Sequence, residues 1–278
     1  MLPAGRPDRG RLHVAVQAIG QRHDERSRRL PGRPRHGNQD LDPIPGVAKA
    51  PGVGAIPPRP RRRTVNRDLA STMPPLQAPE PPLVLASGSA TRAALLKAAG
   101  LAFQCVAPAV DESAVLAALR SAGAAAEEAA VSLAELKARS ATGRSPPGSL
   151  ILAADQILEL DGAWLEKPAD LAAARAQLRS LRGRTHRLVS AAVVVKEGAR
   201  IWHTTQSAEL TVRPFTDAFL EAYLERCGET VLSSVGAYRL EGVGAQLMSR
   251  VRGDHFAILG LPLLPLLAFL REQRVLLD

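Results

Sequence analysis

Cysteine is scarce in this sequence, and long apolar runs are absent. Only two cysteines, Cys105 and Cys227, occur in 278 residues. They are too few for a disulfide framework, and their separation does not match a metal-binding motif. The longest apolar run, residues 256–270, contains two prolines and falls short of the roughly 20 residues that cross a bilayer. These absences exclude a disulfide-stapled class and favour a soluble, cytoplasmic protein without a membrane partner.

Net charge is also absent from most of the chain, because the excess of basic residues lies in the first quarter. Residues 1–72 contain 15 Lys/Arg, 6 Asp/Glu and 10 of the 22 prolines, whereas residues 73–278 contain 21 residues of each charge. The first segment also lacks apolar periodicity and cannot bury enough surface to offset its ordering entropy. We therefore expect residues 1–72 to be disordered or not translated, and residues 73–278 to form one globular domain.

Three interpretations of the basic segment remain open. It could be an arm for nucleic acid or an acidic surface, with its densest run from Arg59 to Arg63. It could be a targeting peptide, although it has no apolar core for secretion and its Pro/Gly content fits a transit peptide poorly. We favour the third interpretation, a wrongly assigned start site, because Met73 lies at the boundary. The globular part itself is not basic, so nucleic acid is not its expected partner.

The globular part begins with a pattern that suits phosphate binding. Residues 83–86 are apolar and predict a buried strand, and a helix over residues 93–99 follows, with Ser89 as N-cap and Gly100 as stop. Free amides and the dipole at a helix N-terminus favour an anion, and Arg92 adds donors. The turn is not a P-loop, because no Gly-Lys-Ser/Thr follows. An ordinary strand–helix corner is the alternative.

The candidate catalytic pair lies in the middle of the chain. The apolar residues 150–154 predict a strand that delivers Asp155 at its carboxyl end, where ligands gather in open α/β sheets. The turn residues 161–162 separate this strand from Lys167, so a hairpin could bring an acid and a base together. A surface aspartate and a solvated lysine are the alternative. Lys137, near the end of a predicted helix, could equally be a cation that suits the helix dipole.

Strands and helices alternate over the rest of the chain. The composition predicts helices over 113–120, 124–139, 171–181 and 218–226 and from residue 262 onwards, and strands over 103–106, 185–195, 201–212 and 245–251. A hairpin at residues 196–198 interrupts the alternation. The expected fold class is therefore α/β with a mixed central sheet.

The ordered set of short motifs resembles the Maf family, the septum-formation-inhibitor-like nucleoside triphosphate pyrophosphatases. The resemblance covers residues 83 to about 270. The matching segments are residues 85–92, 95–96, 110–112, 133–138, 154–156, 161–162, 167–168, 183–186, 236–238, 241–242 and 260–262.

The resemblance implies an elongated Maf/ITPase-like fold with a cleft between two lobes, often as a homodimer. It implies hydrolysis of a nucleoside triphosphate to the monophosphate and pyrophosphate with a divalent cation, Mg²⁺ or Mn²⁺. Asp155 corresponds to the family's proton acceptor. The positions that line the phosphate and metal site are Ser87, Arg92, Glu112, Lys137 and Lys167, with Glu112 and Asp155 as candidate metal ligands. We add Ser89 and Thr91, from the same turn, as candidate substrate contacts.

Two residues bear on which nucleotide is cleaved. Gln156 and Glu241 resemble the branch of the family that acts on 7-methyl-GTP, whereas the dTTP/UTP branch carries Thr and Gln there. A carboxylate could accept hydrogen bonds from guanine and complement the positive charge of a 7-methylated ring. Thr91 matches neither branch, and Glu241 could be a solvated turn residue. A dTTP/UTP pyrophosphatase, a general phosphatase, and a non-catalytic division regulator or nucleic-acid-binding protein remain alternatives.

Overall fold

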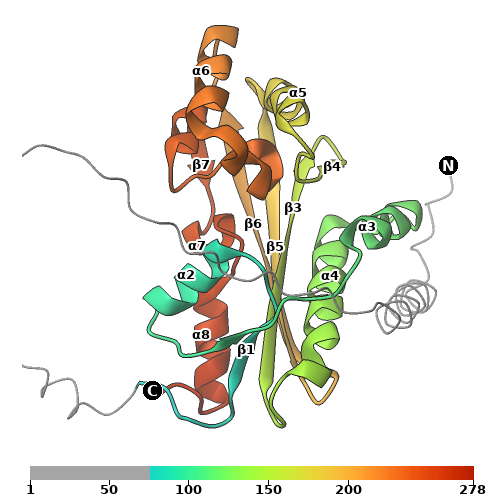
Figure 1. The fold of residues 1–278 in the computed structure, drawn as a ribbon, viewed down its shortest axis with the longest axis vertical. Coiled ribbons are helices and arrows are strands. Elements are labelled where there is room, and N and C mark those ends of the chain that lie inside the picture. Colours follow the sequence, from blue (N-terminus) through green and yellow to red (C-terminus); the bar gives the residue numbers. More distant parts are fainter. Residues whose placement is uncertain (1–75) are drawn as a thin grey trace, which may run out of the picture.

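The structure is a computed structural model that describes residues 76–278. The basic segment 1–72 and the candidate start Met73 lie outside the described residues. Three long strands run side by side along the elongated body, namely β3 (Leu150–Leu160), β5 (Thr185–Lys196) and β6 (Ala199–Val212) (Figure 1). Among the described helices, none combines the length and the apolar character that a membrane crossing requires.

The seven-stranded sheet is mixed, as the sequence predicted. Its order is β2-β1-β3-β5-β6-β7, and β4 pairs with β3 off this path. The short strand β1 (Leu83–Leu85) pairs in parallel with both β2 (Gln104–Cys105) and β3. All other pairs are antiparallel, including those of β4 (Ala163–Leu165) and β7 (Met248–Arg252).

Helices cover the two faces of the sheet. On one face, α2 (Ala90–Ala98) and α8 (Leu263–Glu272) pack against β1, β3 and β5. On the other face lie α3 (Glu112–Ser121) and α4 (Ala126–Ala141), as Figure 1 shows. Farther along the strands, α5 (Leu171–Leu181) and α6 (Asp217–Cys227) form a separate layer. A short helix, α7 (His255–Ile258), precedes α8.

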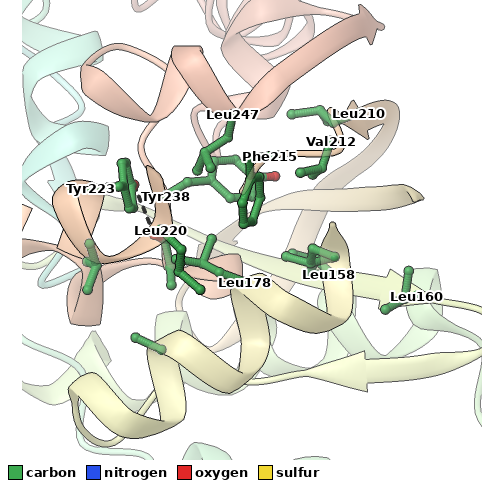
Figure 2. Close-up of a cluster of buried hydrophobic side chains, with 14 of the residues drawn as sticks. Leu158, Leu160, Leu178, Leu210, Val212, Phe215, Leu220, Tyr223, Tyr238 and Leu247 are labelled. Atoms are coloured by element: carbon green, nitrogen blue, oxygen red, sulfur yellow. Dashed lines mark hydrogen bonds between the residues drawn. The ribbon is translucent and has the colours of Figure 1, made fainter. Parts of the chain in front are cut away.

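Alternation along β3 separates the apolar core into two faces, and position along the strand divides one of these faces again. Leu150 and Leu152 face α2 and α8, Ile151 and Ala153 face α4, and Leu158 packs against α5 and α6. Figure 2 shows the last of these clusters, in which Leu158 and Leu178 lie beside the rings of α6 and the loop that follows it. On the face that carries Leu150, Leu152 and Leu158, the core therefore forms one cluster at each end of β3, with Gln156 between the two clusters.

Several boundaries differ from the sequence-based expectation. The central strand continues through Asp155 to Leu160, since residues 157–160 are also apolar and pair with β5. The expected strand at 245–251 begins three residues later, after a 3₁₀ turn over Val243–Leu247. The strand expected at 103–106 is reduced to the two residues of β2. Helix α7 was not predicted, because four residues are too few to show a helical period.

Asp155 therefore does not lie at the end of its own strand but at the end of the neighbouring strand. The last residue of β1, Leu85, pairs with Leu152, and β4 begins to pair with β3 only at Leu158. Residues 153–157 consequently have a strand neighbour on the β5 side alone. The rule that ligands collect at the carboxyl ends of parallel strands holds here for β1.

Candidate active site

A cleft of about 970 Å³ opens at this interrupted edge of β3. The turn from β1 to α2, the helices α3 and α4, and the segments after β4, α6 and α7 all contribute to its walls. All ten residues that the sequence singled out line it, namely Ser87, Ser89, Thr91, Arg92, Glu112, Lys137, Asp155, Gln156, Lys167 and Glu241. The fold thus brings together residues that are up to 154 positions apart in the chain.

The turn between β1 and α2 has the hydrogen bonds expected of a helix start. The Ser89 hydroxyl accepts from the backbone N–H of Arg92 at 3.3 Å and caps α2. The hydroxyl of Ser87 accepts from the Ser89 N–H at 3.2 Å and from the Arg92 guanidinium at 3.4 Å. First-turn amides have no partner within a helix, so the N–H groups of residues 90 and 91 are available to an anion in the cleft.

Arg92 is held by a carbonyl from the far end of the chain. Its Nε donates to the carbonyl of Gly260 at 2.8 Å. Gly260 has a φ of +91°, which favours glycine, and a Cβ there would lie 3.4 Å from the guanidinium. Burial lowers the pKa of Arg92, yet a guanidinium remains protonated at neutral pH. Arg92 is therefore an oriented, permanent cation on the cleft wall.

Asp155, Lys137 and Glu112 form a charged triad at the base of the cleft. The Lys137 ammonium from α4 lies 2.5 Å from Asp155 Oδ1 and 2.9 Å from Glu112 Oε2. Asp155 and Lys137 are buried, with 6% and 5% of their surface exposed, whereas Glu112 is exposed. Buried charges are retained in proteins when they are paired, so the contact explains how Lys137 and Asp155 can both be buried in the cleft.

Burial raises the pKa of Asp155, against the lowering influence of Lys137 and Arg92. A carboxylate that is desolvated and held by a specific cation in a cleft is a candidate general base. The nearby guanidinium and ammonium favour its ionised form, while burial makes that form more basic than a solvated carboxylate. The site thus holds the components for activating a water molecule.

The two carboxylates also fit a divalent cation. Lys137 contacts one oxygen of each, which leaves Asp155 Oδ2 and Glu112 Oε1 without a partner among the described residues. Mg²⁺ is commonly held by one or two carboxylates together with phosphate oxygens and water. Within residues 76–278, no three His, Cys, Asp or Glu side chains come together as a metal cage, so a bound ion would need ligands from the substrate.

Lys167 and Glu241 lie at the mouth of the cleft. Lys167 is exposed and makes no ion pair with another described residue. Glu241 has 31% of its side chain exposed, and its Oε1 accepts from Arg239 Nε at 3.0 Å and Nη2 at 2.9 Å. Its Oε2 has no partner in the described part of the chain. Lys167 therefore offers a free cation, and Glu241 offers one carboxylate oxygen.

Gln156 is largely occupied by the protein. Its amide nitrogen lies within hydrogen-bonding distance of Ser190 Oγ at 2.9 Å and of the carbonyls of Ala257 and Ile258 at 3.1 and 3.0 Å. The buried hydroxyl of Ser190 also donates to Ala257 at 2.7 Å. These bonds fasten α7 to the sheet just before Gly260. If Gln156 contacts a nucleobase, its side-chain oxygen is consequently the group that is available to do so.

Sequence inspection missed several residues of the cleft. Arg120, Trp164, Glu166, Tyr238 and Arg239 also line it. Glu166 precedes Lys167 directly, but a single Glu beside a Lys carries no pattern that separates it from a solvated surface residue. Arg120 and Glu166 are 46 positions apart, so only the fold reveals that they interact.

Tyr238 is held by a buried histidine, His186. The Tyr238 hydroxyl lies 2.6 Å from His186 Nε2, while Nδ1 has no partner among the described residues. Protonated histidine needs two acceptors, and the side chain is 2% exposed. Burial accordingly lowers the pKa of His186 from 6.5 to about 4. We therefore interpret His186 as a neutral, structural residue that holds Tyr238.

This shift predicts a specific pH dependence of stability. The unfolded chain takes up a proton at His186 below pH 6.5 and the folded chain only near pH 4, so stability is lost as the pH falls through this window. The loss amounts to about 3 kcal/mol in the free energy of unfolding. His186→Gln, which does not titrate, should lose correspondingly less between pH 7 and pH 4.5 in urea denaturation. An equal loss in both proteins would contradict this account of His186.

Known proteins resemble the described part of the chain closely. The family model described as Maf-like protein matches residues 82–273. A nucleoside triphosphate pyrophosphatase of Paramagnetospirillum magneticum is 52% identical over 190 residues, which cover 68% of this chain and 97% of that protein. One from Rhodospirillum rubrum is 48% identical over 71% of this chain and 98% of its own length.

A third relative, of Rhizobium etli, is described as a 7-methyl-GTP pyrophosphatase. It is 48% identical over 192 residues, which cover 69% of this chain and 96% of the relative. The family match spans the sheet, the helices on both faces and every residue of the cleft discussed above. The chain belongs to the Maf family.

Proposed function

We propose that this Maf-family chain, a nucleoside triphosphate pyrophosphatase, hydrolyses 7-methyl-GTP to 7-methyl-GMP and pyrophosphate. The observation that carries the proposal is the buried pair of Asp155 and Lys137 at the base of a cleft lined by further cations. Relatives described as nucleoside triphosphate pyrophosphatases support the reaction class. The relative described as a 7-methyl-GTP pyrophosphatase supports the nucleotide.

The cleft carries charges suited to a triphosphate. Such a substrate brings about three to four negative charges, so positioning and charge neutralisation are the main tasks of the protein. Arg92 and Lys167 are cations without an ion-pair partner among the described residues, and the first-turn amides of α2 face the same cleft. We assign the phosphates to this side, with the hydroxyls of Ser87, Ser89 and Thr91 beside them.

Asp155 is assigned the role of general base. It takes a proton from a water molecule whose oxygen forms a new bond to the α-phosphorus. The bond from the α-phosphorus to the bridging oxygen breaks, and pyrophosphate leaves with that oxygen. Lys137 orients the carboxylate through its contact at 2.5 Å. Arg92 and Lys167 stabilise the charge that develops on the phosphate oxygens.

We assign the free oxygens of Asp155 and Glu112 to a divalent cation, Mg²⁺ or Mn²⁺. Oxygens of the substrate phosphates would supply further ligands to this cation. When bound, such an ion supplies additional neutralisation of the phosphate charge. Glu112 is suited to this role because it is exposed to the cleft and tied to Lys137 through its other oxygen.

Glu241 is assigned to the base. Arg239 fixes one of its oxygens and leaves the other for the N1–H or the exocyclic amine of guanine. The carboxylate also complements the positive charge of a 7-methylated ring. Neither dTTP nor UTP carries such a charge, so the arrangement favours the modified purine.

The assay that tests the proposal measures pyrophosphate release by the full chain with Mg²⁺ or Mn²⁺. The nucleotides are 7-methyl-GTP, GTP, dTTP, UTP and CTP. We expect kcat/KM for 7-methyl-GTP to exceed that for GTP by about 10-fold or more, and activity to disappear with a chelator and return with the ion. Preference for dTTP or UTP would refute the assignment of Glu241, and orthophosphate as product would indicate a general phosphatase.

A further inference from the structure

A cluster of polar contacts joins α3 to the segment that carries Lys167. Arg120 Nη1 donates to Glu166 Oε1 at 2.9 Å, and Arg120 Nη2 donates to the carbonyl of Trp164 at 3.2 Å. The guanidinium also lies 5.6 Å from the centre of the Trp164 ring. Ser113, in the first turn of α3, donates to the other oxygen of Glu166 at 3.3 Å. Both oxygens of Glu166 are thus bound by one helix.

The segment after β4 has few other constraints. β4 is three residues long and pairs only with the end of β3. Beyond it, the Glu166 carbonyl accepts from Gln177 of α5 at 2.8 Å, and α5 begins at Leu171. Lys167 itself is exposed and has no ion-pair partner among the described residues. The backbone next to Lys167 is therefore held on one side by what fixes Trp164 and Glu166, and on the other by the buried Pro168.

The helix that makes these contacts also reaches the catalytic triad. Glu112, in the first turn of α3, contacts the Lys137 ammonium at 2.9 Å. Arg120 lies eight residues farther along the same helix, or about 12 Å at 1.5 Å per residue. One rigid element thus contacts both the base of the cleft and the segment at its mouth. It can set the position of Lys167 relative to Asp155.

A single exposed ion pair contributes little to stability, so a purely stabilising role does not explain this cluster well. The side chains of Arg120 and Glu166 are 37% and 40% exposed, and all five residues of the cluster, including Lys167, line the cleft. Holding a flexible lysine within about an ångström of a working position can change a rate much more than it changes stability.

We propose that Arg120, through Glu166 and Trp164, is a positioning residue that places Lys167 on the triphosphate. The expected loss in kcat/KM rests on the proposed function, because it assumes that Lys167 binds the phosphates of the substrate. Arg120→Gln removes the forked donor and should lower kcat/KM by about 10-fold, mainly through KM, because Lys167 would bind the phosphates less well. The same substitution in a Lys167→Met background should then cause no further loss, since the residue that Arg120 positions is absent.

A matched control separates this effect from the loss of any surface arginine. Arg175 of α5 makes a two-bond pair with Glu221 of α6 at 2.6 and 2.7 Å, outside the cleft. Arg175→Gln should leave kcat/KM within about twofold of the wild-type value.

A second measurement does not depend on activity. Amide hydrogen exchange in a peptide covering residues 163–170 should be faster in Arg120→Gln than in the wild type and unchanged in Arg175→Gln. If the wild-type protein released no pyrophosphate, the proposed function would be wrong. The exchange rates would still show whether Arg120 fixes the segment 163–170. Additive losses in the double variant, or unchanged exchange in Arg120→Gln, would overturn the proposal.

Discussion

Asp155→Asn should lower kcat for pyrophosphate release by at least about 100-fold while the protein remains folded. The amide cannot take a proton from water, so general-base catalysis is lost. Its oxygen can still accept from Lys137, and Lys137 keeps Glu112 as a partner at 2.9 Å. Steady-state kinetics and a thermal melt of the two proteins provide the comparison.

Glu159→Gln is the matched control for this substitution. It also converts a carboxylate on β3 to an amide, but Glu159 pairs with Arg187 at 2.9 Å and lies outside the cleft. Its kcat should stay within about twofold of wild type. Wild-type turnover by folded Asp155→Asn would remove Asp155 from the mechanism.

Lys137→Met should be the second variant with a large loss, on the order of 100-fold or more in kcat/KM at neutral pH. Burial raises the pKa of Asp155, and Lys137 lowers it. Without the ammonium the pKa of Asp155 rises further, so less of the carboxylate is ionised at pH 7. The rising limb of the pH profile should shift to higher pH, and part of the activity should return as the pH is raised.

Stability supplies an independent readout for Lys137. A buried carboxylate whose pKa is raised on folding destabilises the folded state as the pH rises above its unfolded value. The free energy of unfolding should therefore fall more between pH 5 and pH 8 in Lys137→Met than in the wild type. Lys97→Met, on the exposed side of α2, is the control and should behave as the wild type. A pH profile that keeps its shape in Lys137→Met would contradict the assignment of Lys137.

Local chemistry was sufficient to predict several features of the site. Ser89 caps α2, as its position before an alanine- and leucine-rich run suggested. The turn at Asp161 and Gly162 has φ values of +48° and +81° and joins β3 to β4. The mixed sheet also followed from the hairpin between β5 and β6. In each case the information lies within a few consecutive residues.

Features that depend on distant residues were not predictable. The position of Asp155 beside the end of β1 depends on the register between two strands 65 residues apart. The occupation of the Gln156 amide depends on α7, about 100 residues later. For Lys137 the sequence left two interpretations open, and its contact with Asp155, 18 positions later, is visible only in the fold. Which distant residues become neighbours depends on how the strands and helices pack, and the composition of each segment does not specify this.

The most direct test of the central claim is to identify where water attacks. The full chain is incubated with 7-methyl-GTP or GTP in ¹⁸O-labelled water, and the products are analysed by mass spectrometry. The account predicts equal amounts of nucleoside monophosphate and pyrophosphate, with the label in the monophosphate, and an initial rate at least about 100-fold lower for Asp155→Asn. Nucleoside diphosphate with labelled orthophosphate, or label in pyrophosphate, would contradict it.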